Sequence, residues 1–162
     1  CGSLNNNQPL HIHHIQPFRT FTNRTAANRL QNLVALCPAC HRQAETGVRI
    51  RSGMAGISYL LHNLAPLLLM CDAEDIGVHY DPNSTLGEGQ PTLVIFDEIP
   101  GGLGLAENLY ERHDQLLNYG YDTIAHCECE DGCPSCVGPI GDEGSGGKAE
   151  ALAIFNVLIN HG

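Results

Sequence analysis

The chain has 162 residues, 43% of them hydrophobic, and a formal net charge of −10. That length leaves room for one ordinary domain or two small ones, and the apolar fraction excludes general disorder. No apolar run approaches the roughly 20 residues that span a bilayer, so we expect no membrane-spanning segment. Because the chain opens with Cys1 rather than Met, we expect it to be a fragment or a processed chain.

The charge is distributed unevenly along the chain. The first 51 residues hold six arginines and one acid, Glu45, for a net charge of +5, whereas the other 111 hold two basic and 17 acidic residues, for a net charge of −15. A polyanion such as DNA, or an acidic protein surface, is therefore expected to bind the N-terminal part. Four arginines of this part are candidate contacts to a DNA backbone: Arg19, Arg24, Arg29 and Arg42.

The first 45 residues are predicted to form two strands and the start of a helix. Residues 10–15 alternate in the way a strand does, and a polar loop follows them. Residues 33–36 form a second apolar segment, which leads into the turn 37–40. A helix is expected from His41 onward, so that a hairpin folds against a helix.

The rest of the chain is predicted to form helices around short strands. From Ser52, apolar residues recur at spacings of three and four, which predicts an amphipathic helix that Pro66 kinks or shortens. We then expect a short strand at 75–80, a loop at 81–91 and a buried strand at 92–96. A helix at 105–118, a Gly-rich linker at 138–147 and a closing helix at 148–159 are expected to follow. The closing helix is expected to bury Leu152, Phe155 and Leu158. This mixture of elements predicts an α+β fold class.

The cysteines are grouped as in zinc sites. Cys71 stands alone, whereas four others lie within ten residues: Cys127, Cys129, Cys133 and Cys136. Four thiolates match tetrahedral Zn²⁺ in a structural role, with an iron–sulfur cluster as a minor alternative. Disulfide scaffolds spread their cysteines more widely and are the weaker alternative. Cysteines grouped for zinc rather than spread for disulfides indicate a reducing compartment, and we therefore expect a cytoplasmic protein.

A second structural zinc site is predicted around the turn that joins Cys37 to Cys40. Structural zinc takes four ligands, and the sequence supplies only Cys1 besides these two. Cys1-Gly2 resembles the end of a Cys-x-x-Cys-Gly element, so the fourth cysteine is expected upstream of this chain. His11 is a weaker candidate for that ligand.

Histidines and an asparagine accompany the hairpin and the helix that follows it. The series His13-His14, Asn32 and His41 resembles the HNH endonuclease family, whose ββα-metal fold carries it, over about residues 1–45. The resemblance implies that His14 is the general base and that the side-chain amide of Asn32 holds this base in orientation. It implies further that His13 and His41 hold Mg²⁺ or another divalent cation, with Glu45 as a candidate third ligand. Such a site hydrolyses a DNA phosphodiester, because the base activates water while the cation neutralises charge.

From Arg49 to its last residue, the chain resembles the zinc-binding C-terminal domain of MrfA-type superfamily-two DNA helicases. The matching segments are 51–56, 64–72, 95–102, the four-cysteine cluster and 146–150. The resemblance implies DNA as a partner, a helicase motor domain or subunit upstream, and a role in DNA repair or in defence against foreign DNA. Together, the two resemblances predict an N-terminally truncated HNH-like module at 1–48 and a zinc-binding helicase domain at 49–162.

Other functions are less well supported. If the histidines bind only structural zinc, the chain is a non-catalytic scaffold for DNA or for a protein partner. Asp97 and Glu98 follow a strand as the magnesium-binding acids of ATPases do, but Lys148 lies in a segment without the first Gly and the final Ser or Thr of a phosphate loop. We therefore expect no ATP hydrolysis by this chain and no small-molecule cofactor, and we expect these two acids to cap the strand or face solvent.

Overall fold

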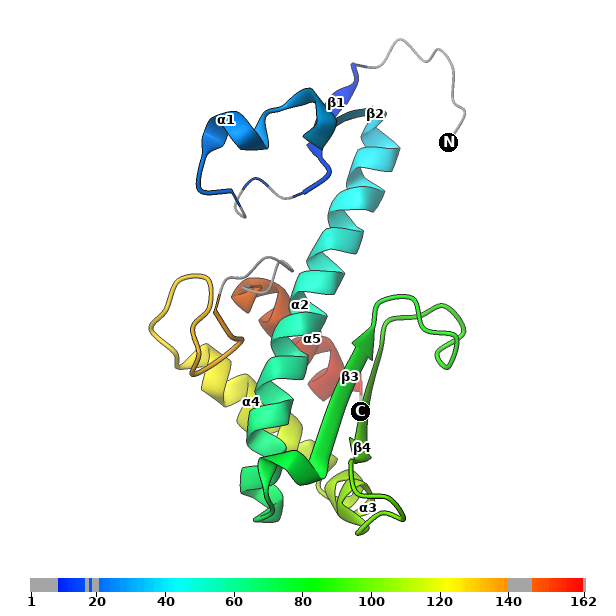
Figure 1. The fold of residues 1–162 in the computed structure, drawn as a ribbon, viewed down its shortest axis with the longest axis vertical. Helices are drawn as coiled ribbons and strands as arrows, with labels where there is room; N and C mark the ends of the chain where they lie inside the picture. The colour runs from blue at the N-terminus through cyan, green and yellow to red at the C-terminus, as the bar shows by residue number, and fades with distance from the viewer. Residues whose placement is uncertain (1–8, 17, 19–20, 140–146, 162) are drawn as a thin grey trace. The chain divides into compact units, whose positions relative to one another are not determined.

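The structure is a computed structural model that describes residues 9–16, 18, 21–139 and 147–161 (Figure 1). The chain divides into two compact units, Cys1–Arg49 and Ile50–Gly162. Both units combine helices with a two-stranded antiparallel sheet, which confirms the predicted α+β class. Among the described residues, no helix combines the length and the apolar character that crossing a bilayer requires.

The first unit is a hairpin followed by the start of a long helix. Strand β1 (His11–His14) pairs with β2 (Leu33–Leu36), and His13 lies opposite Val34. The connection holds a short helix, α1 (Arg24–Ala27), and a 3-10 turn, η2 (Leu30–Asn32). The side chain of Asn23 caps the first turn of α1, because it accepts a hydrogen bond from Thr25 N. Both predicted strands of this unit are present.

Helix α2 (Pro38–Leu69) is continuous where two helices were expected. Its residues 38–49 belong to the first unit and its residues 50–69 to the second. Gly56 weakens the helix locally but serves packing, because a Cβ there would lie 2.9 Å from Val137 Cβ. The helix ends three residues after the buried Pro66, where Met70 adopts a left-handed conformation with φ 54°.

The second unit contains a hairpin made of β3 (Ile76–Asp81) and β4 (Thr92–Asp97), preceded by the 3-10 turn η3 (Ala73–Asp75). Val78 lies opposite Ile95. The prediction that 92–96 is a buried strand was wrong in its burial, because most of β4 is half-buried and Phe96 is 37% exposed. Val78, Leu93 and Ile95 of this hairpin are half-buried and pack against the core.

The helix expected at 105–118 is two helices, α3 (Leu105–Glu111) and α4 (His113–Ala125). Arg112 between them leaves the helical conformation, with φ −113° and ψ 17°. The apolar pattern continues across this break, since Leu109 and Leu116 are both buried, and it therefore could not indicate the interruption.

The closing helix α5 (Lys148–His161) begins where it was expected to begin. Phe155 is fully buried and Leu152 is half-buried, but Leu158 is 43% exposed, so the prediction of its burial was wrong. Phe155 packs on α4 where Gly120 leaves room, because a Cβ on Gly120 would lie 2.6 Å from the phenyl ring. Most of the predicted linker at 138–147 lies outside the described residues.

The core of the second unit lies between the second part of α2, α4, α5 and the hairpin (Figure 1). Cys136 belongs to it with none of its surface exposed. The other three cysteines of the cluster, Cys127, Cys129 and Cys133, are half-buried and pack against this core.

Candidate functional site

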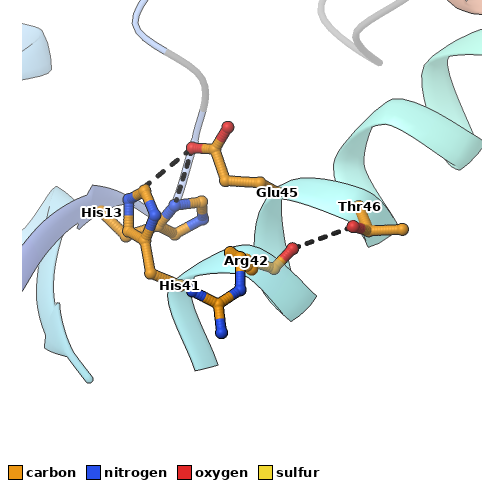
Figure 2. Close-up of polar contacts among 5 residues, drawn as sticks. All are labelled: His13, His41, Arg42, Glu45 and Thr46. Atoms are coloured by element: carbon orange, nitrogen blue, oxygen red, sulfur yellow. Dashed lines mark hydrogen bonds and ion pairs between the residues drawn. The ribbon is translucent and has the colours of Figure 1, made fainter. Parts of the chain in front are cut away.

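Three potential metal ligands converge in the first unit. His13 on β1 and His41 and Glu45 on α2 place their ligand atoms within 4.8 Å of one another. Glu45 Oε1 lies 3.6 Å from His13 Nδ1 and 3.7 Å from His41 Nε2, as Figure 2 shows. The two imidazole rings meet edge to face, with centroids 5.3 Å apart.

Local structure explains this convergence. His41 and Glu45 are four residues apart in α2 and thus share one face of the helix. His13 reaches them from the hairpin, and its side chain is 12% exposed, against 22% for His41 and 54% for Glu45. The two nitrogen ligands are thus sheltered, while the carboxylate lies on the side that solvent reaches. Two imidazoles and one carboxylate are suitable ligands for a divalent cation and leave coordination positions open.

His14 follows His13 directly but has different neighbours. Its Nε2 lies 2.9 Å from Asn28 Oδ1, and its ring meets the ring of Phe18 edge to face at 5.5 Å. Successive residues of a strand point to opposite faces, and among the described residues His14 is not a member of the three-ligand group. Its role as general base stays a prediction.

Asn32 makes its hydrogen bonds to the backbone. Its Nδ2 donates to Ala27 O at 2.9 Å and to Gln16 O at 3.1 Å, and its Oδ1 accepts from Gln16 N at 2.7 Å. Asn32 thus joins the segment after β1 to the end of α1, and Asn28 is the side chain within hydrogen-bond distance of His14. Nothing in the spacing of the sequence singled out Asn28.

The predicted first zinc site is described only in part. Cys40 N donates to Cys37 Sγ at 3.5 Å, and this contact is the main cause that lowers the pKa of the Cys37 thiol. Cys1 lies outside the described residues, and within them Cys37 and Cys40 do not belong to any group of three potential ligands. The ring of His11 lies 5.0 Å from that of His41, edge to face.

The arginines predicted to contact DNA are on the surface where they are described. Arg24, Arg29 and Arg42 are exposed, and Arg19 lies outside the described residues. The carbonyl of Arg42 accepts a hydrogen bond from Thr46 Oγ1 at 2.9 Å within α2 (Figure 2). The guanidinium groups are therefore accessible to a phosphate backbone.

The four cysteines of the second unit form one compact group. Cys127 Sγ lies 3.5 Å from both Cys129 Sγ and Cys133 Sγ, and Cys136 Sγ lies 3.5 Å from Cys129 Sγ and 3.7 Å from Cys133 Sγ. A tetrahedral ion with Zn–S bonds of about 2.3 Å separates its ligands by roughly this distance. The donor set thus fits a structural zinc ion with no position left open.

The thiols of this group differ in acidity. Desolvation raises the pKa of Cys129 to about 12, whereas a hydrogen bond from the backbone N–H of Ser135 lowers the pKa of Cys133 to about 7. Zinc binds thiolates and displaces their protons.

Two polar residues have structural roles that the sequence did not reveal. The carboxylate of Asp97 accepts hydrogen bonds from the backbone N–H groups of four consecutive residues, 103–106, and these bonds lower its pKa. Asp97, the last residue of β4, thereby caps the start of α3, whereas it was expected to cap the strand or face solvent. Lys148 donates its side-chain N–H groups to the carbonyls of Cys127 and Cys129. The bonds of Lys148 join residues 21 and 19 positions apart in the sequence.

Two family models match the chain. The model of the MrfA Zn-binding domain matches residues 57–137, and that of the HNH endonuclease matches residues 1–47. The first match contains the end of α2, the whole of β3, β4, α3 and α4, and the four-cysteine cluster, and the second contains the three-ligand group.

Similar proteins of known sequence include one described as a helicase. The Uncharacterized ATP-dependent helicase YprA of Bacillus subtilis (strain 168) is 39% identical over 85 residues, which cover 52% of this chain and 11% of YprA. The Uncharacterized protein MJ1572.1 of Methanocaldococcus jannaschii is 35% identical over 86 residues, which cover 52% of this chain and 77% of that protein.

Solved structures of the helicase MrfA share this fold. The DUF1998 helicase MrfA bound to DNA matches with a TM-score of 0.61 and 34% identity, and the same helicase bound to DNA and AMPPNP matches with a TM-score of 0.55 and 34% identity. These matches cover 68% and 64% of this chain but only 14% of the MrfA chain. The chain thus spans a small part of the length of both YprA and MrfA.

Proposed function

This chain belongs to the MrfA Zn-binding domain family, and on that premise we propose that it forms the C-terminal region of a DNA helicase in which an HNH-like module hydrolyses DNA phosphodiester bonds. The zinc-binding unit stabilises the assembly. DNA and a helicase motor, in the same polypeptide or in a partner subunit, are the partners, and the process served is DNA repair or defence against foreign DNA.

The observation that carries the proposed hydrolysis is the group formed by His13, His41 and Glu45. Two sheltered imidazoles and one carboxylate open to solvent are a ligand set for a catalytic cation, because the phosphate can fill the remaining positions. When bound there, a divalent cation supplies a Lewis acid for the phosphate and the leaving oxygen. The imidazoles suit a transition-metal ion at least as well as Mg²⁺.

The residues around this group have separable tasks. His14 takes a proton from the attacking water, which a histidine can do near neutral pH. Asn28 holds the ring of His14, and Asn32 holds the backbone on which both lie. The exposed Arg24, Arg29 and Arg42 bind phosphates and so position the strand to be cut.

A non-catalytic scaffold is the second candidate function. It is favoured by one observation, namely that His14 contacts Asn28 and is not a member of the three-ligand group. In that case the first unit binds DNA through its arginines without cutting it.

A nicking assay distinguishes the two functions. The full chain is incubated with supercoiled plasmid and Mg²⁺ or Mn²⁺, beside His14→Ala and the control His79→Ala, which removes an exposed histidine from β3 in the second unit. We expect nicking by the wild type and the control and a loss of about 10²-fold or more in His14→Ala, the usual effect of removing a general base. Undiminished nicking by His14→Ala would exclude His14 as the base, and no nicking with either metal would favour the scaffold.

A further inference from the structure

Lys148 lies where the start of α5 contacts the cysteine cluster. It is the first residue of α5, and Gly147 before it packs so tightly on α2 that a Cβ there would lie 2.8 Å from Ser52 Oγ. Ala151 N donates to Gly147 O at 2.7 Å, so the first turn of α5 is formed at this contact. The backbone at Lys148 is thereby held against α2 by contacts that do not involve its side chain.

From this point Lys148 makes three hydrogen bonds to the loop that carries the first two cysteines. Its Nζ donates to Cys127 O at 2.5 Å and to Cys129 O at 2.7 Å, and its backbone N donates to Asp131 O at 3.2 Å. The side chain is partly buried. Bonds from an ammonium to carbonyl oxygens are charge-assisted and become stronger where solvent is reduced.

The two halves of the cluster differ in how they are held. Around the second half, Cys136 N and Gly138 N both donate to Cys133 O, at 3.0 and 3.1 Å, so this turn carries its own hydrogen bonds. Cys127 and Cys129 are separated by a single residue and lie in a segment without helix or strand. Their carbonyls point to the ammonium of Lys148, which therefore orients the backbone from which both thiols project.

The positive charge of Lys148 also lies beside a cluster that becomes negatively charged when zinc is bound. Zinc with four thiolates carries a net charge of −2, and the loop around it adds Glu128, Glu130 and Asp131 without any Lys or Arg. From position 113 to the end of the sequence, Lys148 is the only Lys or Arg. Its ammonium is directed toward the cluster, although acidic residues are abundant in this half of the chain.

We propose that Lys148 is a positioning residue of the zinc centre, which orients Cys127 and Cys129 and offsets the negative charge of the zinc-bound thiolates. It also joins the zinc centre to the start of α5, so that zinc binding and the docking of α5 support each other. This role rests on the zinc-binding unit of the proposed function and is independent of DNA cleavage.

The test measures zinc release from the full chain. After elemental analysis has established one zinc per four-cysteine cluster, excess chelator is added and the release rate is followed for the wild type, Lys148→Met and Lys148→Arg. We expect Lys148→Met to release zinc about 10- to 100-fold faster, since partners of this kind usually change metal affinity by that factor. Lys148→Arg, which keeps the charge, is expected to restore most of the retention. The control Arg51→Met removes an exposed positive charge of the same unit and is expected to match the wild type.

A spectroscopic readout separates positioning from a merely structural role. With Co²⁺ in place of zinc, Lys148→Met is expected to change the thiolate-to-metal and ligand-field bands, because two of the four sulfurs lose their orientation. If Lys148→Met does not fold, Lys148→Gln is compared with Lys148→Arg in the same way. Wild-type release rates and unchanged Co²⁺ bands in Lys148→Met or Lys148→Gln would overturn the proposal. Chain that contains no zinc at all would instead contradict the zinc assignment itself.

Discussion

Cys136→Ser is expected to unfold the second unit. Cys136 is fully buried in the apolar core and supplies one of four thiolates, so the substitution removes a zinc ligand and leaves a hydroxyl among apolar side chains. Structural zinc contributes roughly 10–16 kcal/mol of apparent binding free energy in small domains, about as much as a whole domain's stability. Circular dichroism and thermal unfolding should show loss of the cooperative transition of this unit, and a strong chelator should reproduce that loss in the wild type.

Cys71→Ser is the matched control, because Cys71 is a half-buried thiol of the same unit outside the four-cysteine group. It should keep its zinc and its cooperative transition. A Cys136→Ser chain that unfolds at the wild-type temperature without zinc would mean that the core folds independently of the metal.

His41→Ala is expected to abolish plasmid nicking, with a loss of roughly 10³-fold or more. The substitution removes one of two sheltered imidazoles from the proposed cation site. A catalytic cation contributes several kcal/mol of charge stabilisation in the transition state, and about 1.36 kcal/mol corresponds to a tenfold change in rate. The measurement is the nicking rate at saturating Mn²⁺, with circular dichroism to establish that the helix content is unchanged.

His62→Ala provides the control for this prediction, because His62 is an exposed histidine of the same helix, α2, in the second unit. It should nick at the wild-type rate. If His41→Ala retained that rate as well, the three-ligand group would not be the source of the cleavage.

Features determined by short stretches of chain could be predicted from the sequence. The four cysteines within ten residues predicted a compact thiol group, and the spacing of His41 and Glu45 placed both on one helical face. The hairpin of the first unit and the two strands of the second were predicted from alternation and apolar runs, although the pairing of β3 with β4 was not. In each case the spacing along the chain determines the geometry.

Contacts between distant segments could not be predicted. The carboxylate of Asp97 binds backbone groups up to nine residues away, and Lys148 reaches a loop about twenty residues before it. The contact of Asn28 with His14 depends on the path of a connection that carries no motif. Arg112 interrupts a helix without any change in the apolar pattern. Such features arise from tertiary packing, which residue types and spacings alone do not specify.

The most direct test of the central claim is Mn²⁺ binding by the zinc-loaded full chain, followed by electron paramagnetic resonance. The account predicts one bound Mn²⁺ per chain in the wild type, with hyperfine coupling from imidazole nitrogen, and loss of this site in both His13→Ala and His41→Ala. An absence of nitrogen-coupled Mn²⁺, or a site that survives both substitutions, would contradict the cation site on which the proposed DNA hydrolysis depends.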